Sequence, residues 1–333
     1  MIPIYRHRAI LVFAFFAALA LALWRAMDEP RPLSAQDRAA LYKSALPQPD
    51  SSQTVYQLGH SLVGHDIPAF IEQLAASAGF PDHRYNSQLG WGTSLREHWD
   101  PAHPVNGFDD MNTTQAWRDP HEALDSGDYD SFIMTEMVEL KDAIRWHDSA
   151  RYATLWAAKA RAGRPDIRVY MYESWPHLTT LDDWLHRLDT DPDALWEGTI
   201  LAQAMAQSGT GVIHVIPVGR VMAALTRAAA AQGGVAGMAD HTDLFARTPT
   251  SDLDPIHLND VGNYLVALTH FAVLYHQDPR GIPHELLRAD GSMAQAPPPE
   301  LAELMQETVW SVTRALPVTG LGMSHSDSGA ALQ

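Results

Sequence analysis

Short apolar runs alternate with amphipathic segments over most of the chain. The first run, residues 54–58, is followed from residue 66 to residue 78 by apolar residues at i, i+3 and i+4 spacing, which predicts a strand, a turn and a helix. Four more strands are predicted at residues 83–89, 129–136, 167–172 and 212–217. Further helices are predicted at residues 35–44, 145–162, 181–188, 194–207, 220–231, 262–275 and 301–315. Strands that alternate with helices favour a three-layer α/β/α fold around a mostly parallel sheet of about five strands.

The N-terminus carries the most apolar segment of the chain. Arg6 and Arg8 precede the sixteen apolar residues 9–24, and a polar, proline-rich stretch follows. A basic flank before an apolar run of this length is typical of an export signal or signal-anchor. We expect residues 1–26 to place the body of the protein in the periplasm or another extracytoplasmic space. An uncleaved anchor in the inner membrane is the favoured form, and a cleaved signal is the alternative.

Composition and motifs narrow the range of functions. The chain has 23 Lys and Arg against 40 Asp and Glu, a net charge of −17, which disfavours binding to nucleic acid or to anionic lipid surfaces. The absence of cysteine excludes disulfides, thiolate nucleophiles and cysteine-ligated zinc or iron–sulfur sites. We find neither a G-x-G-x-x-G nor a G-x-x-x-x-G-K loop, nor an H-E-x-x-H motif. We therefore expect no cofactor, no metal and no nucleic-acid partner, and membrane contact through the N-terminal segment only.

Candidate site residues stand where predicted strands end. Ser61 follows the first strand, Gly90 and Gly92 lie after the second, and Glu136 ends the third. In open α/β sheets these carboxyl ends form one edge, where sites lie. A serine nucleophile needs an imidazole to take its proton and a carboxylate to orient the imidazole. The D-x-x-H sequence Asp254-Pro255-Ile256-His257, just before the long helix at 262–275, can supply both groups.

These blocks resemble those of the SGNH (GDSL-type) hydrolases over roughly residues 52–285. Gly59-His60-Ser61-Leu62 is similar to the GDSL block, with His60 in place of Asp, and residues 254–257 are similar to the D-x-x-H block. The resemblance implies a flavodoxin-like sheet, Ser61 as nucleophile, His257 as general base and Asp254 as its orienting carboxylate. It also implies an oxyanion hole with backbone N–H donors from Ser61 and Gly92, with Gly90 as a near alternative. A G-x-S-x-G elbow is absent, which disfavours the α/β-hydrolase type.

One block departs from the family pattern. Glu136 stands where the family has an asparagine that donates to the oxyanion. A carboxylate would oppose an oxyanion unless burial kept it protonated. Three alternatives stay open: a hole with backbone donors only, a third donor from Thr135 or Asn86, or a role for Glu136 in binding a substrate hydroxyl. Trp91, in the glycine turn, offers either a flat ring for a sugar or an ordinary core side chain.

We therefore divide the chain into an export segment at 1–26, a linker at 27–53, an SGNH-like domain at 54–285 and a C-terminal extension at 286–333 with one helix and a disordered end. The expected function is that of an exported serine esterase that acts through an acyl-enzyme on Ser61. The preferred substrate is an ester on a carbohydrate. The alternatives are an O-acyltransferase that modifies an exported polysaccharide with the same triad, and a catalytically degenerate binding protein suggested by His60 and Glu136.

Overall fold

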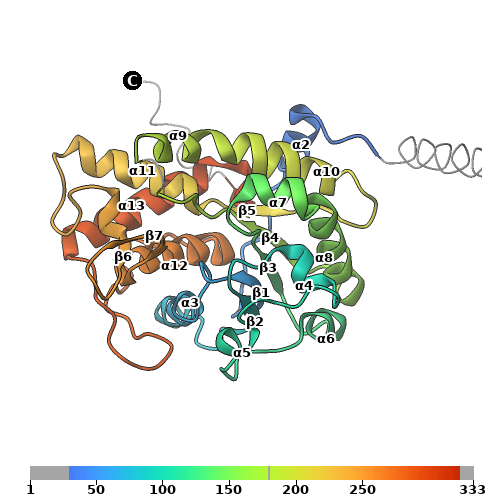
Figure 1. The fold of residues 1–333 in the computed structure, drawn as a ribbon, viewed down its shortest axis with the longest axis horizontal. Helices are drawn as coiled ribbons and strands as arrows, with labels where there is room; N and C mark the ends of the chain where they lie inside the picture. Colours follow the sequence, from blue (N-terminus) through green and yellow to red (C-terminus); the bar gives the residue numbers. More distant parts are fainter. Residues whose placement is uncertain (1–29, 179–180, 323–333) are drawn as a thin grey trace, which may run out of the picture.

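The computed structural model describes residues 30–178 and 181–322 (Figure 1). Within these residues, five parallel strands form the main sheet in the order β2-β1-β3-β4-β5. They are β1 (Thr54–His60), β2 (Arg84–Gly90), β3 (Ser131–Met134), β4 (Arg168–Tyr172) and β5 (His214–Ile216). Because every neighbouring pair is parallel, the carboxyl ends of all five strands lie at one edge of the sheet.

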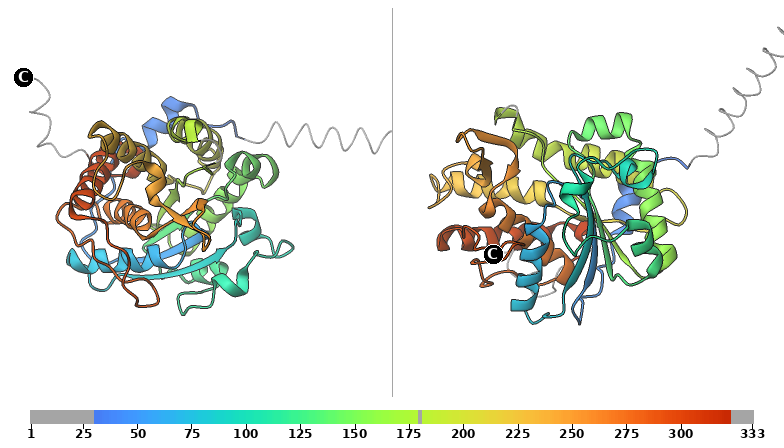
Figure 2. Two further views of the ribbon diagram at one scale, coloured as in Figure 1. Left: turned by 60° about the vertical axis from the view of Figure 1, so that its left-hand side comes forward. Right: turned by 60° about the horizontal axis from the view of Figure 1, so that its bottom comes forward.

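Helices cover both faces of this sheet, so the predicted three-layer α/β/α fold is confirmed (Figure 2). One layer contains α3 (Asp66–Ser77), α11 (Val218–Ala231), α12 (Asp260–Tyr275) and α13 (Pro299–Ala315), whose apolar side chains share one buried cluster. A second cluster lies under α4 (Leu95–Trp99), α6 (Pro120–Ser126), α8 (Ser149–Gly163) and the π-helical segment η1 (Pro192–Leu201). The remaining helices are α2 (Ala35–Leu41), α5 (Phe108–Met111), α7 (Leu140–Trp146), α9 (Leu181–Asp191), α10 (Ala202–Ala204), η2 (His241–Leu244) and η3 (Pro317–Thr319).

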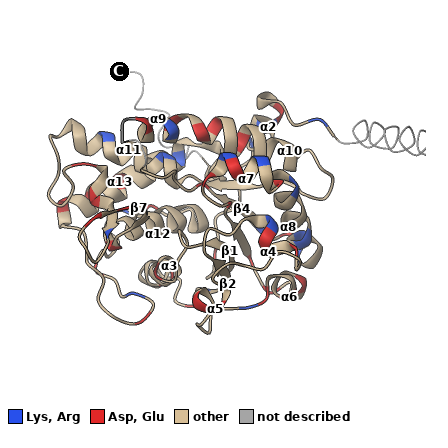
Figure 3. Cartoon of the chain, viewed as in Figure 1, with Lys and Arg blue, Asp and Glu red and all other residues tan. Residues whose placement is uncertain are grey.

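The apolar patterns explain which elements are central. β1 and β3 have neighbours on both sides, and their side chains are almost all buried, as expected for strands covered on both faces. α12 is buried on every face because it packs between α3 and α13. Acidic and basic side chains are distributed over both helical layers (Figure 3).

The structure differs from the sequence prediction in several places, among them the unpredicted helices α4, α5 and α6 and the two differences that follow. The predicted helix at 145–162 is instead divided into α7 and α8, because Asp148 has φ 51 in the left-handed region. The region around residues 245–258 forms a short antiparallel hairpin that the apolar pattern did not predict, made of β6 (Phe245–Arg247) and β7 (Leu253–Leu258). This hairpin matters for function because β7 contains the D-x-x-H sequence.

The predicted export segment, residues 1–26, lies outside the described residues, as does the chain after residue 322, so both expectations stay predictions. In the part of the chain that the structure describes, no helix has the length and apolar character needed to cross a membrane. The predicted helix at 301–315 corresponds to α13, which packs against α11 and α12 of the main body. The loop before it is also joined to the body, since Arg288 forms an ion pair with Asp260 at the start of α12.

Candidate active site

Ser61 lies in a tight turn between β1 and α3. The His60 carbonyl oxygen accepts the backbone N–H groups of Val63 at 2.9 Å and Gly64 at 3.4 Å, which closes the turn. Gly64 has φ 57, a left-handed conformation that glycine adopts without steric cost. The turn therefore projects Ser61 beyond the carboxyl end of a buried strand.

His60 fastens this turn to the neighbouring strand. Its Nε2–H donates to the carbonyl oxygen of Glu136 at 2.9 Å, and its Nδ1 accepts the Leu62 N–H at 3.4 Å. Burial lowers the pKa of His60 to about 4, so the ring is neutral at pH 7 and carries its proton on Nε2. His60, which replaces the family Asp, thus has a structural role between β1 and the end of β3. The sequence showed the replacement but not this partner.

The structure brings the three proposed triad residues together. His257 Nε2 lies 3.0 Å from Ser61 Oγ, and His257 Nδ1 lies 3.1 Å from Asp254 Oδ2. The His257 ring is half-exposed, whereas Asp254 is mostly covered. The order hydroxyl, imidazole, carboxylate is the arrangement needed for an activated serine.

Asp254 is held by the turn that it begins. Its Oδ1 accepts the backbone N–H groups of Ile256 at 2.9 Å and His257 at 2.8 Å. Burial raises the pKa of Asp254, but these two hydrogen bonds and the His257 imidazole outweigh that effect and leave the pKa below its ordinary value. Asp254 is therefore ionised at neutral pH and fixed in position to orient the imidazole.

Ser61 lines a polar cavity, called the Ser61 hollow below. This cavity, of about 180 Å³, is lined by Ser61 and His257 together with His65, Trp175 and Asn263. A second hollow of about 200 Å³ shares Gly64 and His65 with it. The second hollow is lined further by Tyr85, Ser87, Thr114, Gln115 and Ala289. The two hollows therefore meet at residues 64 and 65; the first is mainly polar, whereas the second mixes polar side chains with the apolar Pro68, Ala116 and Ala289.

The two candidate glycines, Gly90 and Gly92, differ in the structural reason for having no side chain. Gly90 pairs with His60 across β1 and β2, and a Cβ there would lie 2.1 Å from Thr93 Oγ1, so close packing requires the glycine. Gly92 has φ 56 and open space around it. Neither glycine lines the Ser61 hollow.

Glu136 does not face the substrate hollow, which corrects its expected role in binding a substrate hydroxyl. The side chain is fully buried, and its Oε1 accepts the backbone N–H groups of Leu95 at 3.2 Å and Met137 at 2.8 Å. Burial raises the pKa of Glu136 to about 7. The residue therefore joins the end of β3 to the first turn of α4.

Asn86 and Thr135, the candidate third donors, are both engaged elsewhere. Asn86 Nδ2 donates to the Ala116 carbonyl at 3.0 Å, and its Oδ1 accepts the Tyr129 hydroxyl at 2.8 Å. It also lies four residues before the end of β2, roughly 13 Å back along the strand at about 3.3 Å per residue. The Thr135 hydroxyl donates to the Tyr172 carbonyl at 2.8 Å. Neither residue supplies the side-chain donor that the family pattern contains.

The exposure of Trp91 excludes the core alternative, and its role toward a sugar stays a prediction. Trp91 is 49% exposed, so it is a surface side chain and not a core one. Its ring packs over Gly107, where a Cβ would lie 2.3 Å from the indole. Trp91 is absent from the lining of the Ser61 hollow.

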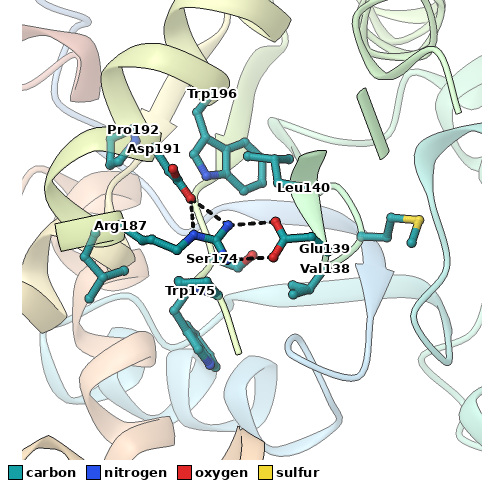
Figure 4. Close-up of a pocket in the computed structure, with 12 residues that line it drawn as sticks. Val138, Glu139, Leu140, Ser174, Trp175, Arg187, Asp191, Pro192 and Trp196 are labelled. Carbon is teal, nitrogen blue, oxygen red and sulfur yellow. Dashed lines mark hydrogen bonds and ion pairs between the residues drawn. The ribbon is translucent and has the colours of Figure 1, made fainter. Parts of the chain in front are cut away.

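A small separate cavity of about 20 Å³ is also lined by Trp175 (Figure 4). The Arg187 guanidinium projects into it and binds both carboxylate oxygens of Glu139, at 2.6 and 2.7 Å, and Asp191 at 2.7 Å. With its cation already paired with two carboxylates, this cavity has no free charge for a ligand and is too small for a substrate. Within the described residues no group of histidine and acidic side chains could hold a metal ion.

Comparisons with known proteins give only distant matches. No family model matches the chain, and no curated protein does. A DUF4886 family protein from Bacteroides uniformis is 15% identical, with a TM-score of 0.48 over 79% of this chain and 95% of its own. A protein from Parabacteroides merdae with the provisional name GDSL-like lipase is 11% identical, with a TM-score of 0.41 over 69% of this chain and 99% of its own. The family assignment therefore remains the resemblance carried by residues 59–62 and 254–257.

Proposed function

We propose that the protein is a serine ester hydrolase with Ser61 as its nucleophile. The observation that carries this proposal is the pair of contacts made by His257, 3.0 Å to Ser61 Oγ and 3.1 Å to Asp254 Oδ2. In an ordinary structural turn, nothing would require a hydroxyl, an imidazole and an ionised carboxylate to align in this order.

The reaction follows from these positions. His257 Nε2 takes the Ser61 proton as Oγ attacks the ester carbonyl carbon, and the same proton then passes to the departing alcohol oxygen. Water, deprotonated by His257, attacks the acyl-enzyme carbonyl, and the acid leaves as Ser61 regains its proton. We propose the backbone N–H groups of Ser61 and Gly92 as donors to the oxyanion, as the resemblance of residues 59–62 to the GDSL block implies.

The polar hollow at Ser61 and the polar side chains of the hollow next to it favour a polar substrate. Tyr85, Ser87, Thr114 and Gln115 line the cavity next to Ser61, and such side chains can donate to and accept from hydroxyl groups. A short acyl ester on a carbohydrate fits this lining better than a long acyl chain, which needs an apolar cavity. The expected export of residues 27–333 would place such an activity outside the cytoplasm.

Two alternatives remain distinguishable from this proposal. An O-acyltransferase would use the same three residues and would differ only in that a sugar hydroxyl resolves the acyl-enzyme; product analysis with a sugar acceptor separates the two. The degenerate binding protein is disfavoured, because His60 and Glu136, the two departures that suggested it, have structural partners and leave the triad intact.

The test is hydrolysis of p-nitrophenyl acetate by the full chain beside Ser61→Ala and His257→Ala. We expect the parent to turn over and both variants to lose at least about 10³ in kcat. Labelling with a fluorophosphonate, mapped by mass spectrometry, should place the adduct on Ser61. A parent that neither hydrolyses the ester nor takes up the label would overturn the proposed function.

A further inference from the structure

Asp254 and His257 lie in a bulge of β7 whose residues are not paired with β6. Phe245 pairs with Leu258, and Arg247 pairs with Leu253. Four residues of β7, 254–257, therefore lie opposite a single residue of β6. Residues in such a bulge leave the hydrogen-bonding ladder, so their carbonyl groups need other partners.

The segment after β4 supplies those partners. The Trp175 indole Nε1–H donates to the Ile256 carbonyl oxygen at 2.8 Å. The Leu178 backbone N–H donates to the Pro255 carbonyl oxygen at 2.8 Å. Residues 175–178 thus hold the bulge where β6 does not.

The peptide group before His257 is consequently fixed at both of its polar atoms. Its carbonyl oxygen, that of Ile256, accepts from Trp175, and its N–H, that of His257, donates to Asp254 Oδ1 at 2.8 Å. Rotation of this peptide about the chain would carry the imidazole away from Ser61. A side chain that blocks the rotation therefore controls the separation of His257 and Ser61.

Trp175 is itself rigidly placed. It is 2% exposed, and it lines both the Ser61 hollow and the small Arg187 cavity, of which the latter is drawn in Figure 4. The following residue is held as well, because Trp184 Nε1–H donates to the Pro176 carbonyl oxygen at 3.0 Å.

We propose that Trp175 is a positioning residue, whose indole N–H holds the 256–257 peptide so that His257 stays in hydrogen-bond reach of Ser61. This inference rests on the proposed function. A misplacement of about 1 Å in reacting groups can cost about 10² in rate, which sets the size of the expected effect.

The experiment compares Trp175→Phe with Trp184→Phe in the full chain. Each substitution keeps a buried aromatic ring and removes one indole N–H from one backbone carbonyl, but only Trp175 touches the peptide before His257. We expect Trp175→Phe to lower kcat for p-nitrophenyl acetate by about 10- to 100-fold, with KM within about threefold of the parent. The rate of fluorophosphonate labelling should fall in parallel. Trp184→Phe should keep kcat near that of the parent. Its Tm should fall by about as much as the Tm of Trp175→Phe, because each variant loses one buried hydrogen bond.

A second variant separates the hydrogen bond from folding. Benzothienylalanine at position 175 keeps the shape of the indole and replaces N–H by sulfur, so it should lower kcat as Trp175→Phe does even if the phenylalanine variant folds poorly. An inactive parent refutes the proposed function itself. An active parent whose kcat survives the loss of the Trp175 N–H, or falls no further than in Trp184→Phe, refutes the positioning role alone.

Discussion

His257 Nε2 lies 3.0 Å from Ser61 Oγ, although 196 residues separate the two in the chain. Ser61 stands at the end of β1 in the main sheet, whereas His257 belongs to the separate β6–β7 hairpin. Their contact therefore depends on the packing of the hairpin against the main sheet. Hydrogen bonds from His60 hold the Ser61 turn, and hydrogen bonds from Asp254 and Trp175 hold the peptide before His257.

Replacing Asp254 by Asn should remove the orienting charge but keep the turn. The asparagine Oδ1 can still accept the N–H groups of Ile256 and His257, so we expect little change in Tm. The amide cannot stabilise the imidazolium that forms on His257, and kcat should fall by about 10³ to 10⁴. Steady-state kinetics beside thermal unfolding measures both effects; an active Asn variant would mean that Asp254 only shapes the turn.

Glu136→Gln should change the pH dependence of stability. The Glu136 carboxyl has a pKa of about 7 when folded against 4.5 as the reference value, so between these pH values the folded state binds more protons than the unfolded state. The free energy of unfolding of the parent then falls as pH rises through this window. Glutamine does not titrate, so the stability of the variant relative to the parent should rise from pH 5 to pH 8, by roughly 2 kcal/mol. Denaturant unfolding at several pH values tests this, and parallel curves for the two proteins would contradict it.

His98 gives the opposite dependence. Burial lowers its pKa to about 3, and its Nε2–H donates to the Gly59 carbonyl oxygen at 2.8 Å beneath the Ser61 turn. Unfolded histidine binds a proton near pH 6.5, so the stability that the neutral ring contributes is present above this pH and is lost as pH falls towards 3. At pH 5 the loss should reach about 2 kcal/mol.

The comparison of the parent with His98→Gln isolates this effect, because other buried groups with shifted pKa values, such as Glu136 and His60, titrate in both proteins. Between pH 7 and pH 5 the variant should lose less stability than the parent. If both lose the same amount, His98 is not held neutral in the folded protein.

Gly90 and Gly92 should differ in their tolerance of alanine. A Cβ on Gly90 would lie 2.1 Å from Thr93 Oγ1 and 2.6 Å from Val105, so Gly90→Ala must displace the loop beside His60 and should cost about 2 kcal/mol. Gly92→Ala meets no neighbour within 4 Å and should cost only the left-handed strain, about 1 kcal/mol. Urea unfolding compares the two, and equal costs would contradict the close packing at Gly90. An accompanying loss of activity in Gly92→Ala, beyond its loss of stability, would mean that the left-handed conformation of this turn matters for the reaction.

The amino-acid sequence by itself predicted the layered sheet and the residues of the proposed triad. Buried runs such as residues 54–58 and 167–172 are local signals, because a strand covered on both faces has to be apolar throughout. The positions of Ser61 and of Asp254 with His257 were also readable, since strand ends meet at one edge and a D-x-x-H turn is a local feature.

Only the tertiary structure decided which polar side chains serve the site and which serve the fold. Glu136 and Asn86 looked available in the sequence, yet each is occupied by backbone or side-chain partners far away in the chain. The anchoring of His257 by Trp175 joins residues 81 positions apart. A hydrogen bond of this kind depends on how the β4–α9 loop meets the β6–β7 bulge. The periodicity of the sequence does not predict this contact, because the contact arises from the packing of the loop against the bulge and not from the local structural preference of either segment.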